Sequence, residues 1–277
     1  MNASIKQSLK KIGLYHPLQS AFRDTISFLQ RLRYKTSYRK YKGGGFECNF
    51  CGASYRRFVP EYPTADIEQA IYGNKVIAGF GENVFCPNCL SKNRERLIKD
   101  VLDYYIDFAG KSILHFSPEK KLYQYVHSKA TVTTIDLEPG FYKTIDPTIA
   151  QGDATQLHFP DEQFDIIIAN HILEHIPDDE KAMKEIFRVL KRNGVAILQA
   201  PWSTNLPTTI EDRSIADPLQ QAILFGQKDH VRIYTLPDYT SRLRRAGFTV
   251  TCIAPTELAQ FQQHAIQEGE PVVLGYK

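Results

Sequence analysis

The fourteen residues from 164 to 177, FDIIIANHILEHIP, join an apolar run to a polar turn. Ile166, Ile167, Ile168 and Ala169 are consecutive apolar residues, so the run has the length of a strand and is far shorter than the roughly 20 residues of a membrane-spanning helix. Its lack of polar alternation is typical of a strand that is buried on both faces, as in a parallel sheet. Polar residues begin immediately after the run, at Asn170. We therefore expect the chain to leave this strand through a turn that can contact a ligand.

Similar apolar runs flank this stretch and are separated by segments with helical patterning. Strands that alternate with helices at this spacing indicate right-handed βαβ units, and such units build a mostly parallel, doubly wound sheet with helices on both faces. The sequence therefore predicts an α/β fold. The predicted strands are 112–116, 131–137, 164–170, 195–200, 248–254 and 271–276, and the predicted helices are 119–127, 179–190, 237–246 and 256–263.

Two acidic residues stand where predicted strands end. Ligands of open α/β sheets bind at the carboxyl ends of the strands, so these positions are candidates for a binding site. Asp136 ends the second strand, about 20 residues past the first strand–helix turn, where an acid accepts hydrogen bonds from ribose hydroxyls. Asp153 follows the expected third strand and can accept a hydrogen bond from an adenine amino group. Together they predict a nucleoside site.

Residues 164–194 resemble one known enzyme family, the class I S-adenosylmethionine-dependent methyltransferases of the type 11 group. The resemblance is carried by FD before the apolar strand, by HILEHI after it, and by EIFRVLKRNG at residues 185–194. It covers residues 110–277 and implies a Rossmann-like fold with a seven-stranded, mostly parallel sheet that binds S-adenosylmethionine as cofactor. The contacts that it implies are Asp136 at the ribose, Asp153 and Ala154 at the adenine, and Asn170 and His171 beside the methyl group, with Leu137 as a further cofactor contact.

The loop after the first predicted strand departs from the family pattern. Members of the family usually have Gly-x-Gly there, because glycine allows the backbone to approach the cofactor closely. This chain has Phe116, Ser117, Pro118 and Glu119 instead. Ser117 is small, Pro118 suits the first turn of a helix, and Glu119 can face the positively charged cofactor, so we expect this loop to contact it. The alternative is a degenerate domain that has lost the cofactor and acts as a binding protein.

Methyl transfer from a sulfonium is an in-line displacement, so the protein must position a nucleophile and remove its proton where necessary. His171 and His230 are the predicted catalytic bases, with His175 as a further candidate. We interpret residues 202–236 as an insertion that covers the acceptor, with Arg232 holding an anionic group of the substrate. The alternative is a loop stabilised by an ion pair between Asp229 and Arg232. The predicted acceptor contacts are His175, Trp202, Asp229, His230, Arg232 and Tyr234.

The spacing His171-x-x-Glu174-His175 also matches the H-x-x-E-H pattern of inverted zinc peptidases. That chemistry requires both histidines on one face of a continuous helix. Pro177 lies two residues past His175, and the pattern directly follows a strand, so the sequence predicts a turn here. We therefore prefer the methyltransferase interpretation to the peptidase one.

Four of the five cysteines form two pairs, Cys48 with Cys51 and Cys86 with Cys89, separated by 34 residues. Two C-x-x-C turns present four thiolates in the tetrahedral arrangement that zinc prefers. Because four protein ligands complete the coordination sphere, we expect the metal to be structural. A redox role is the alternative, although neither pair lies in a thioredoxin-like βαβ pattern. The fifth, Cys252, lies in an apolar run and is predicted to be a core residue.

The net charge of +3 hides an uneven distribution. Residues 1–42 hold ten basic residues and one acid, a net charge of +9, so the rest of the chain carries −6. A basic arm of this kind can bind the phosphates of RNA or an anionic membrane surface. The alternative is a solvated helix that packs on the protein through apolar residues at near-helical spacing. These residues are Leu14, Leu18, Phe22, Ile26 and Leu29.

We predict three parts of the chain: a basic helical arm over residues 1–45, a zinc-binding module over residues 46–92, and a methyltransferase domain over residues 93–277. The favoured function is methyl transfer to a small-molecule or glycan acceptor. The alternatives are an RNA methyltransferase that grips RNA with the arm and the zinc module, and a non-enzymatic binding protein. The first residues lack the apolar stretch of a secretion signal, so we expect a cytoplasmic protein, with a peripheral position at the inner membrane surface as an alternative.

Overall fold

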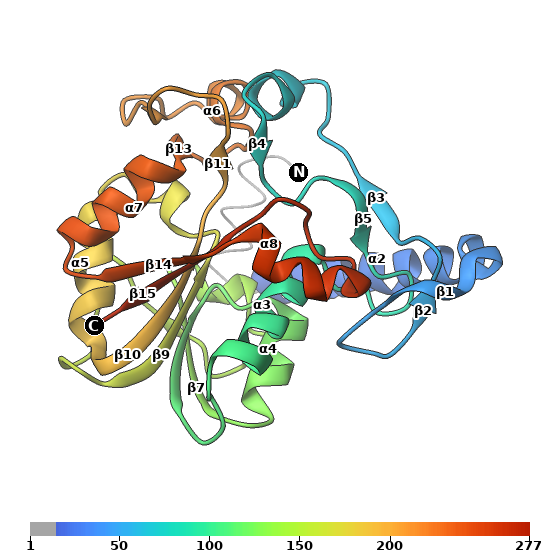
Figure 1. The fold of residues 1–277 in the computed structure, drawn as a ribbon, viewed down its shortest axis with the longest axis horizontal. Helices are drawn as coiled ribbons and strands as arrows, with labels where there is room; N and C mark the ends of the chain where they lie inside the picture. The colour runs from blue at the N-terminus through green and yellow to red at the C-terminus, as the bar shows by residue number, and fades with distance from the viewer. Residues whose placement is uncertain (1–14) are drawn as a thin grey trace.

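The computed structural model describes residues 15–277 and shows the predicted α/β fold (Figure 1). Its central sheet consists of β6 (Ser112–Phe116), β7 (Thr131–Asp136), β8 (Ala150–Gln151), β9 (Phe164–Asn170), β10 (Leu190–Gln199), β14 (Thr249–Ile253) and β15 (Val272–Tyr276). The seven strands lie in the order β14-β15-β10-β9-β6-β7-β8. Strands β6 to β10 are parallel, and β15 runs antiparallel to both of its neighbours, β10 and β14.

Four helices of eight residues or more pack on this sheet, two on each face. They are α5 (Asp179–Val189) and α7 (Leu236–Arg245) on one face, and α3 (Asn93–Tyr105) and α4 (Lys120–His127) on the other (Figure 1). The side chains of β9 alternate between the two cores, with Ile167 in the first and Ile166 and Ile168 in the second. Because both faces of the strand are covered, residues 166–169 are apolar without interruption.

The strand order reverses between β6 and β9, which are neighbours in the sheet. The chain continues from β6 into α4 on one face, whereas it continues from β9 into α5 on the other face. The two connections therefore diverge, and they leave a crevice at the carboxyl ends of the two strands. This is the usual ligand position in an open α/β sheet. Residues 117–119 and 171–175 lie directly after these strands.

One predicted helix differs from the structure at the C-terminal end. In place of a helix over 256–263, α8 (Pro255–Leu258) is followed by a 3-10 helix, η5 (Ala259–His264). Ala265 then has a left-handed backbone with φ of 53° and ends the helical segment. The carbonyl groups of His264 and Ala265 accept hydrogen bonds from the buried Arg96 guanidinium at 2.7 and 2.6 Å. These long-range bonds leave no sequence periodicity, so the pattern of apolar residues could not reveal them.

A second, smaller sheet lies beside the carboxyl ends of the main strands. It consists of β4 (Val76–Ile77), β11 (Trp202–Ser203), β12 (Ile210–Glu211) and β13 (Arg232–Thr235). β4 lies between the two cysteine pairs in sequence, and it pairs antiparallel with β11 of the predicted insertion. The same two regions also meet where η2 (Gln69–Gly73) packs against α6 (Pro218–Phe225). Residues between the cysteine pairs therefore form part of the wall of the crevice, which the sequence did not predict.

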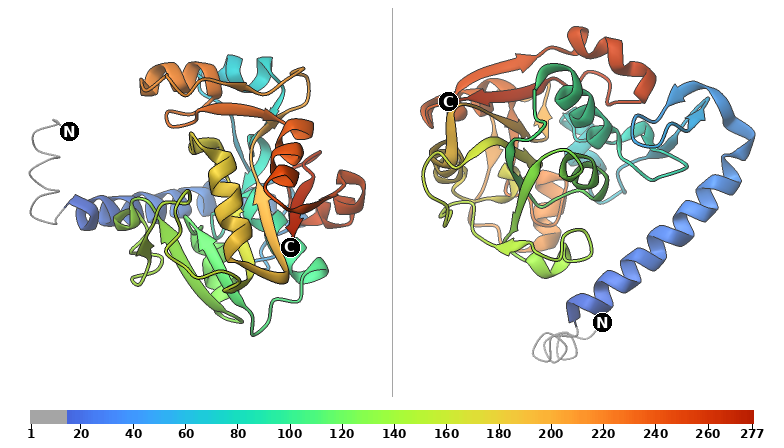
Figure 2. Two further views of the ribbon diagram at one scale, coloured as in Figure 1. Left: turned by 90° about the vertical axis from the view of Figure 1, so that its left-hand side faces the viewer. Right: turned by 90° about the horizontal axis from the view of Figure 1, so that it is seen from below.

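The N-terminal part of the described chain is a long helix followed by short strands. α2 (Tyr15–Ser37) runs along one side of the molecule (Figure 2). Next, β1 (Lys42–Glu47) pairs with β2 (Ser54–Tyr55), and β3 (Val59–Glu61) pairs with β5 (Gly81–Phe85), both antiparallel. Residues 1–14, with Lys6, Lys10, Lys11 and Leu14 of the basic arm, lie outside the described residues.

Polar side chains join α2 to the rest of the protein, and the predicted apolar contact of Leu18 lies outside the described side chains. Arg23 donates a hydrogen bond to the carbonyl of Phe141 at 2.6 Å, and its guanidinium lies 4.1 Å from the centre of the Phe141 ring. Phe22, Ile26 and Leu29 are exposed, so the packing predicted for these three residues is wrong. Within residues 15–277, no helix combines the length and the apolar character that crossing a bilayer requires.

Candidate active site

A cavity of about 890 Å³ opens at the carboxyl ends of β6 and β9. Small-molecule sites usually measure about 300–1,000 Å³, so the volume is suitable for a cofactor together with a substrate. The loops after the two strands form one side, and α2, the start of α3 and residues 71–80 contribute to the rest. The predicted site residues that line the cavity are Ser117, Pro118, Glu119, Asn170, His171, His175, Asp229 and His230.

The loop after β6 adopts a backbone conformation for which glycine is usual. Ser117 has φ of 43°, in the left-handed region that favours glycine. Its N–H donates to the carbonyl of Ile135 at 3.0 Å, and its hydroxyl donates to the Asp136 carboxylate. These two bonds tie the loop to the end of β7. A non-glycine residue in this region costs on the order of 1–3 kcal/mol, and such strain is concentrated at binding sites.

Glu119 connects the two central strands. Its Oε2 lies 3.1 Å from Nε2 of His115, and its Oε1 accepts a hydrogen bond from the Asn170 side-chain amide at 2.6 Å. Burial raises the pKa of Glu119, but the hydrogen bond with His115, together with the nearby charges of His115 and Arg94, more than offsets burial and holds the pKa below its usual value. The cavity therefore contains a buried anion, which suits a positively charged ligand.

The residues predicted to bind the nucleoside lie next to the cavity and not in its lining. The Asp136 carboxylate accepts hydrogen bonds from the Glu138 N–H at 2.6 Å and from Ser117, which does line the cavity. Asp153 is exposed, and its carboxylate accepts from the N–H and the hydroxyl of Thr155 at 2.7 and 2.8 Å. The nucleoside contacts thus stay predictions. The others outside the lining are Phe116, Leu137 and Ala154.

Residues 171–175 form a turn, as the sequence predicts. η4 (Leu173–His175) is a single turn of 3-10 helix directly after β9, and His171 has a left-handed backbone with φ of 57°. The two histidines of the H-x-x-E-H pattern therefore do not share the face of an α-helix, and the peptidase arrangement is absent. The turn instead directs Glu174 into the interior, where it is fully buried.

Three histidines surround the Glu174 carboxylate. Nδ1 of His171 lies 3.3 Å from Glu174 Oε1, and Nε2 of His175 and Nε2 of His230 each lie 4.0 Å from the same oxygen. Burial raises the pKa of Glu174, but His171, together with His175 and His230, more than offsets burial and lowers the pKa to about 2, so the carboxylate is ionised. Burial also lowers the pKa of His230 to about 4, and the ring is therefore neutral at neutral pH.

Three of the predicted acceptor contacts belong to the protein interior. Arg232 is fully buried, and its guanidinium donates to Glu211 at 2.9 Å and to the carbonyls of Leu173, Ile176 and Pro177. The prediction that Arg232 holds an anionic substrate is therefore wrong, because its N–H groups are already used. The alternative prediction, an ion pair between Asp229 and Arg232, is also wrong, because Asp229 contacts His175 instead. The other two residues outside the cavity lining are Trp202, which packs against the main core, and the buried Tyr234.

Replacing Asp179 with alanine is expected to lower the free energy of unfolding by about 3–5 kcal/mol, because it leaves buried cations uncompensated. The carboxylate is fully buried and accepts from Arg242 at 3.0 Å and from the Tyr234 hydroxyl at 2.7 Å. Urea denaturation measures the change. The control is Asp161→Ala, which breaks an exposed pair with Arg188 and should cost less than about 1 kcal/mol. Similar losses in the two variants would contradict the assignment of a buried network.

One part of the chain around the cavity is similar to a known protein family. A family model for the methyltransferase domain matches residues 118–198, from the loop after β6 to the end of β10. Residues 118–198, termed the methyltransferase domain, are similar to this family. The match includes Glu119 and the whole of the turn that follows β9, so the methyltransferase domain contributes both strand-end loops of the cavity.

Relatives of the methyltransferase domain align over short segments. The demethylmenaquinone methyltransferase of Lactobacillus johnsonii is 43% identical over 58 residues, which are 21% of this chain and 24% of the relative. A chloroplastic 2-methyl-6-phytyl-1,4-hydroquinone methyltransferase of Oryza sativa is 33% identical over 101 residues, 36% of this chain and 25% of the relative. The uncharacterized methyltransferase YcgJ of Bacillus subtilis is 33% identical over 106 residues, 37% of this chain and 41% of the relative. The chain thus spans less than half the length of these relatives.

Among solved structures, the YcgJ protein of Bacillus subtilis superimposes with a TM-score of 0.45 at 16% sequence identity. The superposition covers 65% of this chain and 97% of that protein.

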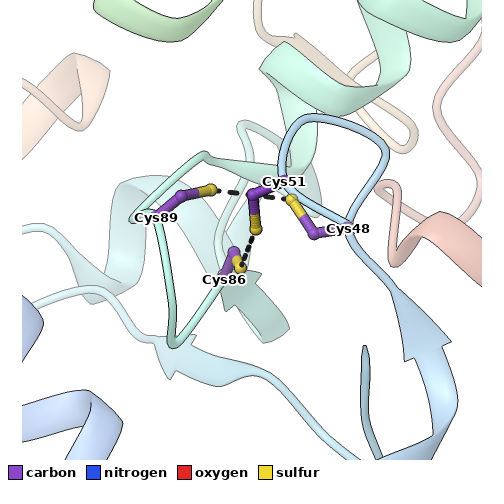
Figure 3. A group of neighbouring side chains, drawn as sticks. All are labelled: Cys48, Cys51, Cys86 and Cys89. Carbon is purple, nitrogen blue, oxygen red and sulfur yellow. Dashed lines mark hydrogen bonds between the residues drawn. The ribbon is translucent and has the colours of Figure 1, made fainter. Parts of the chain in front are cut away.

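In front of the methyltransferase domain, the four paired cysteines converge from two turns, as Figure 3 shows. Sγ of Cys48 lies 3.6 Å from Sγ of Cys89, and Sγ of Cys51 lies 3.8 Å from Sγ of Cys86. A tetrahedral zinc ion with Zn–S bonds of about 2.3 Å separates its sulfurs by about 3.8 Å, so the four residues fit this metal. The prediction that the two pairs meet at one point is confirmed.

Arg94 and Tyr142 line the cavity, and the sequence analysis did not predict either as a site residue. Arg94 lies in the first turn of α3, and its Nε is buried without a hydrogen-bond partner among residues 15–277. Tyr142 lies close to Asp136, and burial together with that carboxylate raises the pKa of Tyr142 to about 12. Arg94 comes only five residues after the second cysteine pair, which is the one signal that pointed to it. Tyr142 lies in an irregular loop, where no periodicity marks a position.

Proposed function

We propose that the protein is an S-adenosylmethionine-dependent methyltransferase whose donor binds in the cavity at the ends of β6 and β9. One observation carries the proposal: the family match supplies both loops that border this cavity, at the point where the strand order reverses. The donor brings an activated methyl group with a positively charged sulfur. Glu119 is a buried carboxylate in the cavity lining, so it can stabilise that charge while Ser117 and Asp136 bind the nucleoside side.

We propose that the acceptor is a small molecule, glycans included, and that it carries a negative charge. Two relatives are named for demethylmenaquinone and for a hydroquinone, which are small molecules. The charge is inferred from Arg94, because a carboxylate or phosphate is the natural partner of a buried guanidinium donor that is left unpaired. Arg94 has a buried donor with no partner among the described residues. The basic residues in the lining are Arg23, Arg31, Lys92, Arg94, Lys120 and Lys121.

Titration calorimetry with S-adenosylmethionine and S-adenosylhomocysteine tests the proposal. Both ligands should bind the wild-type chain, and Glu119→Gln should weaken S-adenosylmethionine by about 10-fold more than S-adenosylhomocysteine, because only the former carries the sulfonium charge. Equal weakening would remove Glu119 from the sulfonium. The absence of heat with both ligands would overturn the enzyme assignment and favour the non-enzymatic binding protein.

We propose that the cysteine cluster holds a structural zinc ion. The sulfur separations support a tetrahedral site, and four thiolates leave no open position for a reacting water. Ser91 Oγ lies 3.3 Å from Sγ of both Cys48 and Cys89, and the adjacent Arg96 guanidinium donates to the Ser91 carbonyl at 2.5 Å. These contacts can position the thiolates and offset their charge.

RNA is a second candidate acceptor, with an anionic membrane surface as a further partner of α2. The observation that favours either is that α2 exposes apolar residues, including Phe22, Phe28 and Leu29, and then the basic residues Arg31, Arg33 and Lys35. Binding to a short RNA and to phosphatidylserine vesicles should be measured at low and at moderate salt. Steeply salt-dependent RNA binding supports the RNA acceptor, since it reports released counterions. No association with RNA at low salt would eliminate it.

A further inference from the structure

Glu174, His175 and His230 all line the cavity, and they bring three potential metal-binding atoms close together. One ligand atom from each residue lies within 4.8 Å of the other two. Both imidazoles direct Nε2 toward the same carboxylate oxygen, at 4.0 Å each. The two rings stand almost perpendicular, with centroids 4.6 Å apart, so they approach Glu174 from different directions.

The Glu174 carboxylate lacks the partners that a buried anion requires. It is fully buried, and neither oxygen accepts a hydrogen bond from any residue that the structure describes. Transfer of an ionised carboxylate from water to the interior costs several kcal/mol unless hydrogen bonds or a cation compensate it. Nε2 of His175 and Nε2 of His230 lie 4.0 Å away, too far for a hydrogen bond, and Nδ1 of His171 makes an ion-pair contact at 3.3 Å without forming a hydrogen bond. A cation placed between these groups would satisfy all of them.

The second ring nitrogen of each imidazole, Nδ1, faces an oxygen atom, as it does in known metal sites. Nδ1 of His175 faces the Asp229 carboxylate at 3.4 Å, and Nδ1 of His230 faces the carbonyl of Phe225 at 3.2 Å. Histidines that bind metals usually donate the second ring N–H to a carboxylate or a backbone carbonyl, which fixes the tautomer and leaves the other nitrogen free for the metal. Both histidines show this arrangement, and both keep Nε2 for Glu174.

We propose that Glu174, His175 and His230 form a second metal site, which binds a divalent transition-metal ion inside the cavity. Two imidazoles and one carboxylate suit Mn²⁺, Fe²⁺, Co²⁺ or Zn²⁺. Bonds of about 2.1 Å from these atoms to one ion require the ligands to approach by less than about 1 Å, which side-chain rotations can supply. Three protein ligands leave coordination positions open toward the cavity, in contrast to the closed cysteine site.

The open positions indicate the class of acceptor, and this step rests on the proposed methyltransferase function. An acceptor with two adjacent hydroxyls, such as a catechol or the vicinal diol of a glycan, can chelate the ion through both oxygens. Metal binding lowers the pKa of a bound hydroxyl, which releases its proton to solvent. The oxygen then forms a bond to the methyl carbon as the bond between that carbon and the donor sulfur breaks. The electron pair of the broken bond stays on sulfur and yields S-adenosylhomocysteine.

Manganese binding tests the site without any assay of activity. Mn²⁺ prefers oxygen and nitrogen ligands to thiolates, so titration of the zinc-loaded full chain reports on this site and not on the cysteines. Wild type should bind one Mn²⁺ per chain, and Glu174→Gln and His230→Gln should each weaken binding by at least about 100-fold. The matched control is Glu268→Gln, an exposed carboxylate that should leave Mn²⁺ affinity unchanged. Thermal melting of each variant verifies that it is folded.

4-Nitrocatechol tests the acceptor class, because its absorption spectrum changes when it chelates a metal. The change should occur with Mn²⁺-loaded wild type and not with Glu174→Gln. Failure of both Mn²⁺ and Co²⁺ to bind beyond the cysteine site would overturn the metal site, as would equal affinity in Glu174→Gln. Metal binding without the spectral change would overturn the chelated acceptor. Calorimetry with S-adenosylmethionine is independent of these measurements. A chain that binds Mn²⁺ but not S-adenosylmethionine would therefore contradict the proposed methyltransferase function and leave the metal site standing.

Discussion

Replacement of Cys48 by serine is expected to release the structural zinc and to lower the melting temperature by about 10 °C or more. Cys48 is fully buried, and its sulfur lies 3.6 Å from that of Cys89. Structural zinc contributes an apparent free energy of about 10–16 kcal/mol in zinc-finger peptides, and each 1 kcal/mol shifts the melting temperature by about 2–4 °C in a chain of this size. Loss of even a part of the free energy of zinc binding should therefore lower the melting temperature strongly.

The consequences should extend to the cavity, because residues 71–80 between the cysteine pairs contribute to its lining. Thiolate-to-cobalt absorption of the Co²⁺-substituted chain measures the metal, and calorimetry measures donor affinity. Cys252→Ser is the matched control, since this half-buried thiol packs against the main core away from the cluster. A Cys48→Ser chain that keeps both the cobalt absorption and the wild-type melting temperature would refute the structural role of the cluster.

Replacement of Asp136 by alanine is expected to weaken S-adenosylmethionine binding by about 100-fold, equivalent to about 2.7 kcal/mol. A carboxylate that accepts from both ribose hydroxyls makes charge-assisted hydrogen bonds of about 1.5–3 kcal/mol each. Asp136 also accepts from Ser117 and from the Glu138 N–H, so its loss releases the strained loop after β6 as well. Calorimetry with S-adenosylhomocysteine should show a similar loss, since both ligands carry the same ribose.

Two control variants distinguish loss of the ribose contact from loss of negative charge or of side-chain shape. Asp107→Ala removes an equal charge from an exposed site before β6, at the opposite end of the strand, and should leave the affinity unchanged. Asp136→Asn keeps the shape and one acceptor oxygen and should have an intermediate affinity. If Asp136→Ala binds the donor as tightly as wild type does, the nucleoside is not held at the tip of β7, and the donor site has to be sought elsewhere in the cavity.

On the acceptor side of the site, neighbouring polar residues in the sequence have different positions in the structure. Arg232 and His230 are two residues apart in a polar segment, and the sequence offers no way to separate their roles. In the structure His230 lines the cavity, whereas Arg232 points into the interior and binds Glu211 together with three carbonyls of the turn after β9. His230 still lies in the loop before β13, whereas Arg232 is the first residue of that strand, so the regular alternation of a strand does not relate the two side chains.

The sequence by itself determined the sheet, both strand-end loops and the two cysteine pairs. Each of these depends on short-range features, namely continuous apolar runs, turn residues and the spacing of ligands within a few positions. Only the tertiary structure decided that α2 and residues 71–80 line the cavity, that Arg232 is internal, and that Glu174 meets His230 across 56 positions of chain. Such contacts arise from packing between distant segments, and a one-dimensional periodicity contains no information about which distant segments become neighbours.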